Sequence, residues 1–357
     1  MLHAIIMAGG SGTRFWPASR RRRPKQLLAL VTDTPLLRMT FDRLNGLVPP
    51  ERVWVVTTAA TADATRELLP ELPAQNVLAE PEGRNTAACT GLAAQACIAQ
   101  DPKAVCVVLP ADHIIEDHDR FRSALTAGAQ HVRANGGLLT FGISPTRPET
   151  GYGYLELGEE CTHDGEWAIH GLKKFIEKPD LDRAETYLDS GRYLWNAGIF
   201  AWQASDLLTE IEKQLPELAN GLETIAAACG GADEDSVLHD VYPTLPATSV
   251  DFGVMENAAQ CWVVPVDFPW SDIGSWPALS ETLPGDENNN VTRGRTTTID
   301  SSSNVVISTG PTVAVVGVDD LVVVATPDAV LVVPKDQAQR VKEVVENLRD
   351  NEWDDVL

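Results

Sequence analysis

Short apolar or β-branched runs alternate with longer segments of helical composition over the first part of the chain. The runs lie at residues 1–8, 52–57, 104–109 and 138–142, and the first of them stops at Gly9-Gly10. Segments 86–100 and 120–134 separate later runs and have the composition of helices. Strands that alternate with helices indicate a mainly parallel sheet that is covered on both faces. We therefore predict an α/β fold with a doubly wound, Rossmann-like sheet.

The pattern changes near Asn288, after the polar stretch 284–290. Five short β-rich pieces follow, at residues 295–299, 305–308, 312–318, 321–326 and 330–333. Beyond Pro334, apolar residues fall on one helical face, at Ala338, Val341, Val344, Val345 and Leu348. We predict a catalytic domain over 1–285 and a small β-rich, β-helix-like domain over 286–357 that ends in a helix. We expect segment 288–357 to be structural or an interface element and to carry no catalytic group.

Length and charge narrow the class of protein. The 357 residues are 44% hydrophobic, enough for one large domain and a smaller one. We expect a cytoplasmic protein, because the N-terminus lacks a basic region before its short apolar run and no later stretch is long enough for a membrane span. A net charge of −23 argues against nucleic acid as a partner. The six cysteines form no Cys-x-x-Cys pair, so we expect reduced thiols, several of them buried.

A glycine-rich loop carries the most informative chemistry. It runs from Gly9 to Arg14 as Gly-Gly-Ser-Gly-Thr-Arg, and Pro24-Lys25-Gln26 follows. Glycines after a strand let backbone N–H groups approach phosphate oxygens, and two cations add to that preference. The loop fits neither a Walker A motif nor the dinucleotide fingerprint. The run Arg20–Arg23 is either part of a local positive site or a solvated charge run.

Asp112 and Asp272 are candidate metal ligands. Asp112 follows a buried strand, at the end where open α/β sheets bind ligands, and Asp272 lies in Trp270-Ser-Asp-Ile-Gly. An isolated aspartate in either place is equally typical of a turn or a helix cap. Two aspartates that converge need a cation, and Mg²⁺ is held by one or two carboxylates plus substrate phosphates.

The loop and its Pro-Lys-Gln sequel resemble the sugar-nucleotide pyrophosphorylase family, in the form found in its mannose-1-phosphate guanylyltransferase branch. The resemblance implies that Arg14, Lys25 and Asp112 are catalytic and that Asp112 and Asp272 hold Mg²⁺. The resemblance also covers Glu80 and the Arg-Asn-Thr-Ala stretch after it. In that branch the corresponding residues lie against the base and ribose of the nucleotide. The implied nucleotide contacts are Ala8, Gly9, Gly10, Ser11, Gly12, Thr13, Arg14, Lys25, Glu80, Asn85, Thr86 and Ala87. Taken alone, Asn85 or Thr86 is equally typical of a helix N-cap.

Three further segments resemble the sugar-site motifs of the family in the same order. They are Gly-Tyr-Gly at 151–153, Phe-Ile-Glu-Lys-Pro at 175–179 and Trp-Asn-Ala-Gly at 195–198. By this resemblance the sugar-phosphate contacts are Gly153, Glu177, Lys178, Asn196 and Gly198. Each motif also has a plainer interpretation, as a turn with surface aromatics or a solvated ion pair. Segment 249–256 matches as well, and we assign it no chemistry beyond shaping the site.

The resemblance implies transfer of GMP from GTP to mannose 1-phosphate, which yields GDP-mannose and pyrophosphate. Glu80 is the main clue for GTP, because a carboxylate accepts hydrogen bonds from the N1–H and N2–H₂ edge of guanine. One alternative is a pyrophosphorylase that uses UTP or dTTP with glucose 1-phosphate. Another is a catalytically silent, sugar-nucleotide-binding regulatory subunit. Some relatives carry an added isomerase module, whereas at this length we expect one activity only. A homodimer is possible in addition.

Overall fold

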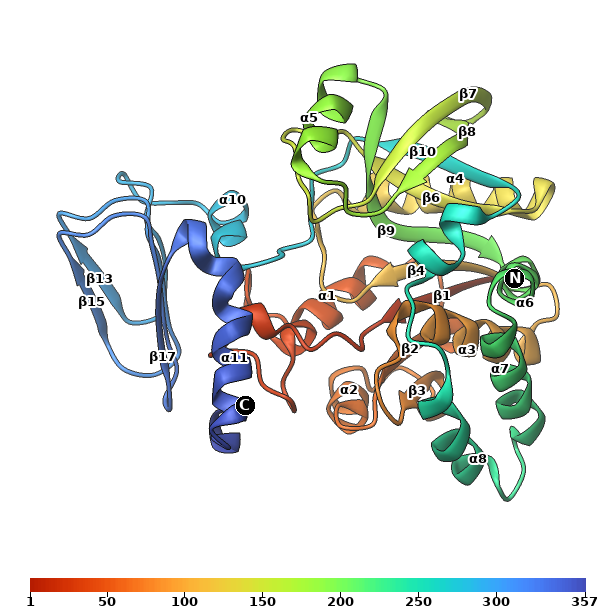
Figure 1. The fold of residues 1–357 in the computed structure, drawn as a ribbon, viewed down its shortest axis with the longest axis horizontal. Coiled ribbons are helices and arrows are strands. Elements are labelled where there is room, and N and C mark those ends of the chain that lie inside the picture. The colour runs from red at the N-terminus through yellow and green to blue at the C-terminus, as the bar shows by residue number, and fades with distance from the viewer. The chain divides into compact units, whose positions relative to one another are not determined.

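The computed structural model describes residues 1–357 and contains two compact units (Figure 1). Unit 1 comprises Met1–Gly9, Thr40–Ala111 and Ile115–Trp270. Unit 2 comprises Gly10–Met39, Asp112–Ile114 and Ser271–Leu357. The chain crosses between the units within α1 (Leu36–Arg43), β5 (Ile114–Ile115) and β11 (Trp270–Ser271).

Unit 1 is built on a nine-stranded sheet with the order β3-β2-β1-β4-β9-β6-β10-β8-β7. Its strands are β1 (Leu2–Met7), β2 (Val53–Thr58), β3 (Val77–Glu80), β4 (Val105–Pro110), β6 (Leu138–Ile143), β7 (Tyr154–Asp164), β8 (Trp167–Ile176), β9 (Tyr193–Gln203) and β10 (Cys261–Val266). Its helices are α2 (Ala62–Leu68), α3 (Asn85–Gln100), α4 (His118–Asn135), α5 (Leu181–Ser190), α6 (Ala204–Gln214), α7 (Pro216–Ala228), α8 (Glu234–Val241) and α9 (Val250–Gly253).

The sheet confirms the predicted α/β class and shows where it departs from a purely parallel order. Strands β3, β2, β1 and β4 are parallel neighbours, as expected for buried strands joined through helices. Strand β9 is antiparallel to both β4 and β6, and β7 and β8 form an antiparallel hairpin. The sheet is therefore mixed, with its parallel half at the N-terminal strands.

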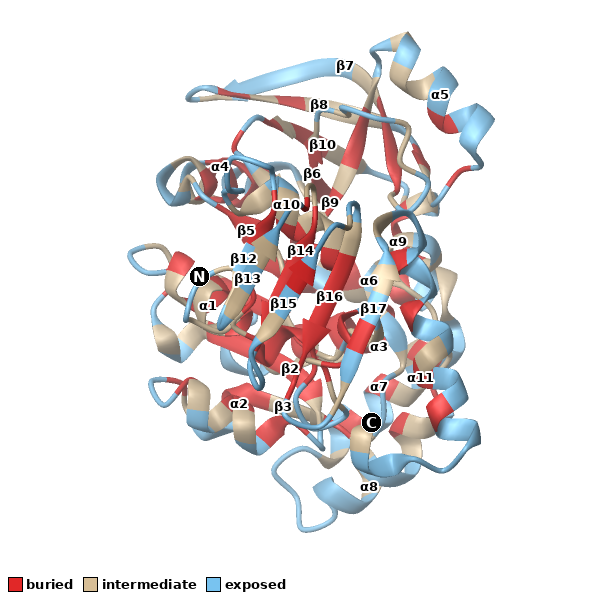
Figure 2. Ribbon diagram, turned by 90° about the vertical axis from the view of Figure 1, so that its left-hand side faces the viewer, coloured by how far each residue is buried: buried red, intermediate tan, exposed pale blue.

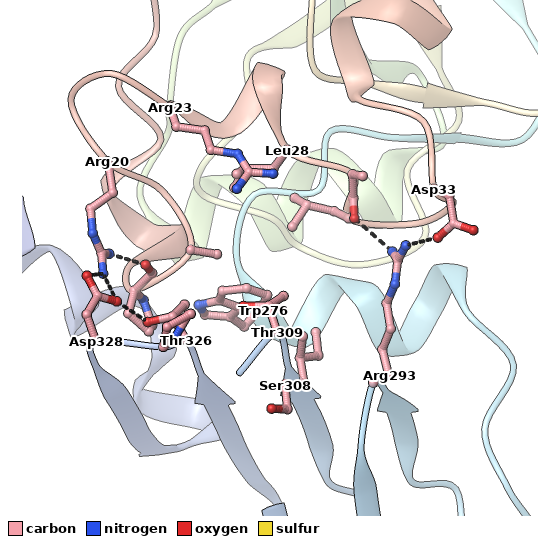
Figure 3. A pocket seen from close by; sticks show the side chains of 17 residues that line it. Arg20, Arg23, Leu28, Asp33, Trp276, Arg293, Ser308, Thr309, Thr326 and Asp328 are labelled. Atoms are coloured by element: carbon pink, nitrogen blue, oxygen red, sulfur yellow. Dashed lines mark hydrogen bonds and ion pairs between the residues drawn. The ribbon is translucent and has the colours of Figure 1, made fainter. Parts of the chain in front are cut away.

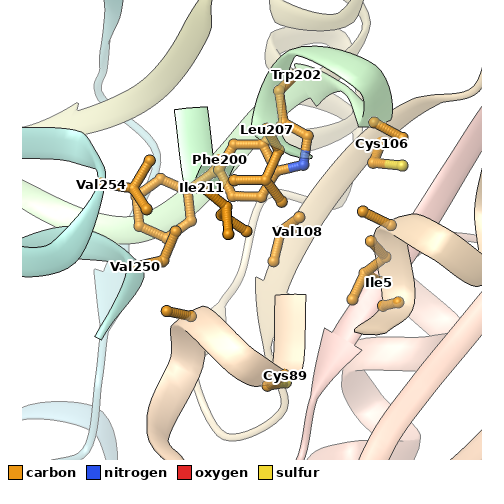
Figure 4. Packing of buried hydrophobic residues seen from close by; sticks show 14 of the residues in the cluster. Ile5, Cys89, Cys106, Val108, Phe200, Trp202, Leu207, Ile211, Val250 and Val254 are labelled. Atoms are coloured by element: carbon orange, nitrogen blue, oxygen red, sulfur yellow. The ribbon is translucent and has the colours of Figure 1, made fainter. Parts of the chain in front are cut away.

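One hydrophobic core fills unit 1 (Figure 4). Ile5 and Val108 lie on the central strands, and Phe200 and Trp202 on β9 stack with ring centroids 5.5 Å apart. Helix α3 buries alanine and cysteine side chains in this core, and small residues allow close approach of a helix to its neighbours. The core fixes the ends of β3, β4 and β9, from which several predicted site residues extend.

Unit 2 contains the short β-rich strands. They are β12 (Val291–Arg293), β13 (Thr296–Ile299), β14 (Val305–Ser308), β15 (Val313–Val316), β16 (Leu321–Ala325) and β17 (Val330–Pro334), with helices α10 (Leu279–Thr282) and α11 (Val341–Asp350). Strands β12, β14 and β16 pair in parallel, as do β13 and β15. The buried side chains of Asn290 and Asn304 hydrogen-bond each other at 3.0 Å across successive turns. The predicted β-rich segment and its terminal helix are confirmed.

A second core holds unit 2 together. Its buried residues come from the stretch after the glycine-rich loop, including Phe15 and Trp16, and from β14, β16 and α11. Figure 2 shows β14 and β16 as mostly buried strands. Trp276 is fully buried and donates through Nε1 to the Trp16 carbonyl at 3.1 Å. The β-rich strands and the segment that follows the glycine-rich loop thus share one apolar interior.

Two other expectations concern the chain as a whole. Cys89, Cys97 and Cys106 are buried free thiols, whereas Cys161 and Cys229 are exposed ones. No helix is both long and apolar enough to span a membrane. The division of the chain at residues 285 and 286 stays a prediction, because unit 2 as packed also includes residues 10–39 and 112–114.

Candidate active site

Lys25 is the centre of a pocket of about 280 Å³ in unit 2, which we call the Lys25 pocket. Its ammonium donates to the carboxylate Oδ2 of Asp112 at 2.7 Å and to the backbone carbonyl of Asp272 at 2.6 Å. The side chain is only 7% exposed, and its Nζ lies 5.5 Å from the centre of the Phe15 ring. A buried ammonium needs such partners, because an unpaired charge out of water is costly. The structure thus brings Lys25, Asp112 and Asp272 together, although no two of them are neighbours in sequence.

The charge of Lys25 also sets the state of Asp112. Burial is the largest single influence and opposes ionisation of this carboxyl, but the Lys25 ammonium, His113 and the hydrogen bonds together hold the pKa of Asp112 below its usual value. Asp112 is therefore a carboxylate near neutral pH, which is the form that ligates a cation.

The glycine-rich loop borders the same pocket. Gly12, Thr13 and Arg14 line it, and Gly12 has a left-handed φ of +61°. A Cβ at Gly12 would lie 2.4 Å from the Lys25 Cβ, so glycine is required both for the turn and for the close approach of the lysine. The exposed Arg14 donates only to the Gly274 carbonyl, at 3.3 Å, and has no carboxylate partner. Its guanidinium is therefore suited to bind an anion.

Lys342 is a residue of this pocket that the sequence did not reveal. It is exposed on α11 and lines the pocket with Lys25 and Asp112. The expectation that segment 288–357 carries no catalytic group stays a prediction, because lining the pocket does not make Lys342 a catalytic residue. The apolar face of the helix was readable from sequence, but one exposed lysine beside that face looks like any solvated residue.

The residues of the Lys25 pocket fit a divalent metal held partly by substrate. No group of three or more His, Cys, Asp or Glu side chains is arranged to hold an ion. Asp112 and Asp272 nevertheless line one pocket with cationic side chains, and they supply hard carboxylate oxygens. Mg²⁺ suits such a sparse set, because it is usually bound by one or two carboxylates plus substrate phosphates.

Glu80 and Tyr242 form a buried polar pair in unit 1. Glu80 ends β3 with 2% exposure, and the Tyr242 hydroxyl donates to its Oε1. Burial raises the pKa of Glu80 to about 7, although the hydrogen bond from Tyr242 partly opposes the shift. A Cβ placed on Gly9 would lie 2.9 Å from Glu80 Oε2, so the backbone after β1 approaches this carboxyl closely. Tyr242 was not among the predicted residues.

The loop after Glu80 is tied to segment 248–250. Helix α3 begins at Asn85, whose Oδ1 accepts from the Thr86 N–H at 2.9 Å. The Thr86 hydroxyl accepts from the Val250 N–H at 2.8 Å, and the Ala87 N–H donates to the Thr248 carbonyl at 3.1 Å. The Thr86 hydroxyl therefore has a structural role, and these bonds hold the start of α3 beside α9.

The five predicted sugar-site residues lie together in unit 1. The Asn196 N–H donates to the Gly153 carbonyl at 2.8 Å, and the Gly198 N–H donates to Asn196 Oδ1 at 3.1 Å. Lys178 Nζ pairs with Glu177 Oε1 at 2.7 Å. A Cβ on Gly153 would lie 2.7 Å from Glu177 Oε2, which explains a glycine at this position.

Two carboxylates missing from the prediction join this cluster. Asp251 Oδ1 accepts from Asn196 Nδ2 at 2.7 Å, and Glu256 Oε1 accepts from the Glu177 N–H at 3.2 Å. Burial and the neighbouring charge of Glu177 raise the pKa of Asp251 to about 6. Both residues belong to the segment 249–256, so the signal was present in the sequence as a match without an assigned role. Carboxylates grouped with an amide are well suited to accept hydrogen bonds from sugar hydroxyls.

Comparison with known proteins identifies the family. Residues 3–289 match the family model described as nucleotidyl transferase, and residues 294–348 match the MannoseP isomerase/GMP-like beta-helix domain. This chain belongs to the nucleotidyl transferase family. The predicted resemblance is thereby confirmed, as is the β-helix-like character of the C-terminal strands.

Relatives within the family are similar over nearly the full chain. "Mannose-1-phosphate guanylyltransferase" of Klebsiella pneumoniae is 41% identical over 99% of this chain and 75% of its own length. The crystal structure of "mannose-1-phosphate geranyltransferase" from Thermus thermophilus is 37% identical and has a TM-score of 0.86, with 98% of this chain and 99% of that chain covered. A "putative glucose-1-phosphate thymidylyltransferase" from Bacillus anthracis has 16% identity and a TM-score of 0.51 over 79% of this chain and 93% of its own, and shows the fold alone.

Proposed function

We propose that this chain is a mannose-1-phosphate guanylyltransferase, which transfers GMP from GTP to α-D-mannose 1-phosphate and releases GDP-mannose and pyrophosphate. The names of the relatives that match over nearly the whole chain support the choice of substrates. The observation that carries the chemistry is the position of Lys25, whose ammonium contacts the Asp112 carboxylate and the Asp272 carbonyl beside the glycine-rich loop.

The proposed reaction is an in-line displacement at the α-phosphorus of GTP. An oxygen of the sugar phosphate forms a bond to this phosphorus, while the bond to the β-phosphate oxygen breaks and pyrophosphate leaves. Phosphoryl-type transfers need positioning and charge stabilisation rather than covalent help from the protein. Lys25 is proposed to stabilise charge that builds on the α-phosphate, and Arg14 to bind the phosphates. Residues Ala8–Thr13 are proposed to offer backbone contacts to the nucleotide.

Asp112 and Asp272 are proposed to hold Mg²⁺. When bound, the ion would neutralise phosphate charge and help orient the reacting groups. Asp112 has a second task, because its carboxylate fixes the Lys25 ammonium at 2.7 Å. A substitution there is therefore expected to disturb both the cation and the lysine.

Residues of unit 1 are proposed to recognise the base and the sugar. Glu80 would accept hydrogen bonds from N1–H and N2–H₂ of guanine, with Asn85, Thr86 and Ala87 at the nucleotide side. Gly153, Glu177, Lys178, Asn196 and Gly198 would contact mannose 1-phosphate, and we add Asp251 to this set because it accepts from Asn196. The cytoplasmic location and a homodimer stay predictions.

A substrate screen tests the proposed activity directly. The purified protein is assayed for released pyrophosphate with four nucleoside triphosphates and with mannose 1-phosphate or glucose 1-phosphate. We expect GTP with mannose 1-phosphate to have the highest kcat/KM. A higher value for UTP or dTTP with glucose 1-phosphate would favour the alternative pyrophosphorylase. No turnover with any pair would favour the silent regulatory subunit.

Replacing the two aspartates tests the metal assignment. Asp112→Asn and Asp272→Asn delete a charge with little change of shape, so each variant is expected to fold, to need more Mg²⁺ and to lose most activity. The double variant should lose little more than the worse single one, because groups that act as a unit are not additive. Full activity of Asp272→Asn at low Mg²⁺ would exclude this residue as a ligand. Asp63→Asn, an exposed aspartate on α2, is the control.

A further inference from the structure

The run Arg20–Arg23 does not act as one charged patch, because its four members have different surroundings. One nitrogen of Arg20, Nη2, contacts both carboxylate oxygens of Asp328 at 3.1 and 3.2 Å, and Arg21 pairs with Asp354 at 3.2 Å. Arg22 is exposed and makes no side-chain hydrogen bond or ion pair. Arg23 is also exposed, but unlike Arg22 it lines a cavity, which is separate from the Lys25 pocket. The proposed transferase reaction uses none of the four.

This cavity, which we call the arginine pocket, has a volume of about 570 Å³ and lies wholly within unit 2. It shares no lining residue with the Lys25 pocket. Figure 3 shows the Arg20–Asp328 pair on one side, the Arg293–Asp33 pair on the other, and the buried Trp276 between them. The volume is in the range of pockets that enclose small molecules.

The two ion pairs fix the walls of the arginine pocket. Arg293 donates to the Ala29 carbonyl at 2.8 Å, to the Thr32 carbonyl at 2.6 Å and to the Asp33 carboxylate at 2.8 Å. Asp328 accepts from Arg20 and from the Thr326 hydroxyl, which lies 2.7 Å away. These contacts hold the loop at residues 29–33 to β12, and the start of the arginine run to the turn after β16. Contacts of this kind restrain the walls, and a restrained site lowers the entropic cost of binding.

Arg23 is the cation of the arginine pocket that no protein group neutralises. The lining includes three arginines and two aspartates, and both aspartates are paired with Arg20 and Arg293. The backbone of Arg23 is held by two hydrogen bonds of 3.0 Å with Arg20, whereas its guanidinium makes no hydrogen bond or ion pair. An excess positive charge at this cavity contrasts with the net charge of −23 for the chain. A planar guanidinium with free donors matches a phosphate group in geometry and charge.

We propose that the arginine pocket is a second ligand site, which binds a sugar phosphate with its phosphate on Arg23. The remaining lining suits the sugar. Carboxylate oxygens of Asp33 and Asp328 accept hydrogen bonds from ligand hydroxyls, and the Thr309 hydroxyl adds a polar contact. A bare anion would leave this polar lining unused, and a neutral sugar would leave Arg23 unpaired. The ligand class therefore combines both groups in one molecule.

Isothermal titration of the full-length protein tests this site, with glucose 6-phosphate, inorganic phosphate and glucose as separate probes. We expect saturable binding of glucose 6-phosphate, and binding of the other two that is weaker by about tenfold or more, because each lacks one set of contacts. Arg23→Ala should weaken glucose 6-phosphate binding by about tenfold or more, and Arg23→Lys by less, since it keeps the charge but loses the fork.

Two control variants separate the arginine pocket from its surroundings. Arg22→Ala removes an adjacent exposed arginine that does not line the pocket, and Lys25→Ala alters the Lys25 pocket. Both variants should bind glucose 6-phosphate with an affinity within about twofold of the parent. A tenfold change in affinity corresponds to about 1.4 kcal/mol. The proposal is overturned by equal losses in Arg22→Ala and Arg23→Ala, by loss of binding in Lys25→Ala, by inorganic phosphate binding as tightly as the ester, or by no saturable binding. Unchanged thermal unfolding of Arg23→Ala would show that any loss is local.

Discussion

At the scale of single residues, Lys25 has a position that only tertiary structure supplies. Its partners are a side chain at Asp112 and a carbonyl at Asp272, and the turn at Gly12 leaves room for its stem. An ammonium has three donors, and two of them are directed to these acceptors. The lysine is therefore preorganised, so it need not be reoriented as charge develops on a phosphate.

We predict that Lys25→Ala lowers kcat much more than it raises KM for GTP. A contact that strengthens as charge builds at the α-phosphorus contributes mainly to the transition state, and loss of one such donor typically costs about 10²- to 10³-fold in kcat. Lys25→Met, which removes the charge but keeps more of the side-chain volume, should behave alike. Steady-state kinetics measure both constants, with the exposed Lys103→Ala as the control. Turnover equal to that of the parent would remove Lys25 from the mechanism.

Glu80, the proposed acceptor of hydrogen bonds from guanine, is predicted to make the preference for this base depend on pH. The pKa of this carboxyl is raised to about 7, so the ionised form that accepts both guanine donors is lost as the pH falls through 7. We predict that KM for GTP rises below pH 7 and that the preference for GTP over ITP, which lacks the 2-amino group, falls in parallel. The assays use saturating mannose 1-phosphate, so that the titration of Asp251 near pH 6 does not dominate the measured KM for GTP.

The variant Glu80→Gln should remove this pH dependence, whereas Glu82→Gln, on the exposed loop, should keep it. The free energy of unfolding depends on pH in the opposite direction. A carboxyl whose pKa rises from 4.5 to about 7 on folding contributes stability below pH 4.5 that is lost as the pH rises through 7. Unfolding measured across this range separates the two effects. A GTP profile that is the same in parent and Glu80→Gln would rule out Glu80 as the titrating group.

At the scale of elements, sequence patterns predict what is local. The predicted apolar run 104–109 corresponds to β4 and segment 86–100 to α3. The apolar helical face beyond Pro334 corresponds to α11, and the bounds differ by a few residues at most. The antiparallel placement of β9 between β4 and β6 was not predicted, because pairing between distant strands leaves no periodic signal in either one.

The same limit applies to the candidate site. Contiguous motifs singled out Lys25, Asp112 and Asn196, and the structure brings each of them into a cluster of polar side chains. Tyr242 and Lys342 stand in no motif, and only packing brings the first to Glu80 and the second to the Lys25 pocket. Side chains that act through tertiary contacts are thus the class that single-sequence reasoning misses.

Helix α11 carries a prediction of its own through Lys342. As an exposed cation lining the Lys25 pocket, it is expected to attract the phosphates of GTP without being essential to the chemical step. Lys342→Ala should raise KM for GTP by about three- to tenfold and change kcat little, consistent with loss of a partly screened contact to a charged group. Arg349→Ala, on the same helix and outside the pocket, should match the parent. A KM unchanged by Lys342→Ala would show that the lysine only borders the cavity.

At the scale of the whole molecule, the packing of unit 2 crosses the sequence boundary between the expected domains. Three stretches, 10–39, 112–114 and 271–357, form this one compact unit. Trp16 donates through Nε1 to the Val356 carbonyl at 2.8 Å, and the Arg21 N–H donates to the Leu357 carbonyl at 3.2 Å. Residues 356–357 thus support the segment that follows the glycine-rich loop. A role of the β-rich segment as an interface between copies stays a prediction, and its contribution to folding can be tested first.

We predict that removal of residues 286–357 abolishes both activity and ordered structure around Lys25. Deletion would expose Phe15, Trp16 and Trp276, which are buried against β14, β16 and α11.

A milder change tests the same packing in a full-length chain. Leu348→Ala removes a core side chain of α11 that is 7% exposed, and should cost about 2–5 kcal/mol. Hydrogen exchange should then show weaker protection in β14, β16 and segment 13–28 together, because they share one core. The exposed Glu346→Ala should leave this protection unchanged. A soluble 1–285 protein with the turnover of the parent, or loss of protection confined to α11, would mean that segment 13–28 folds independently of the β-rich strands.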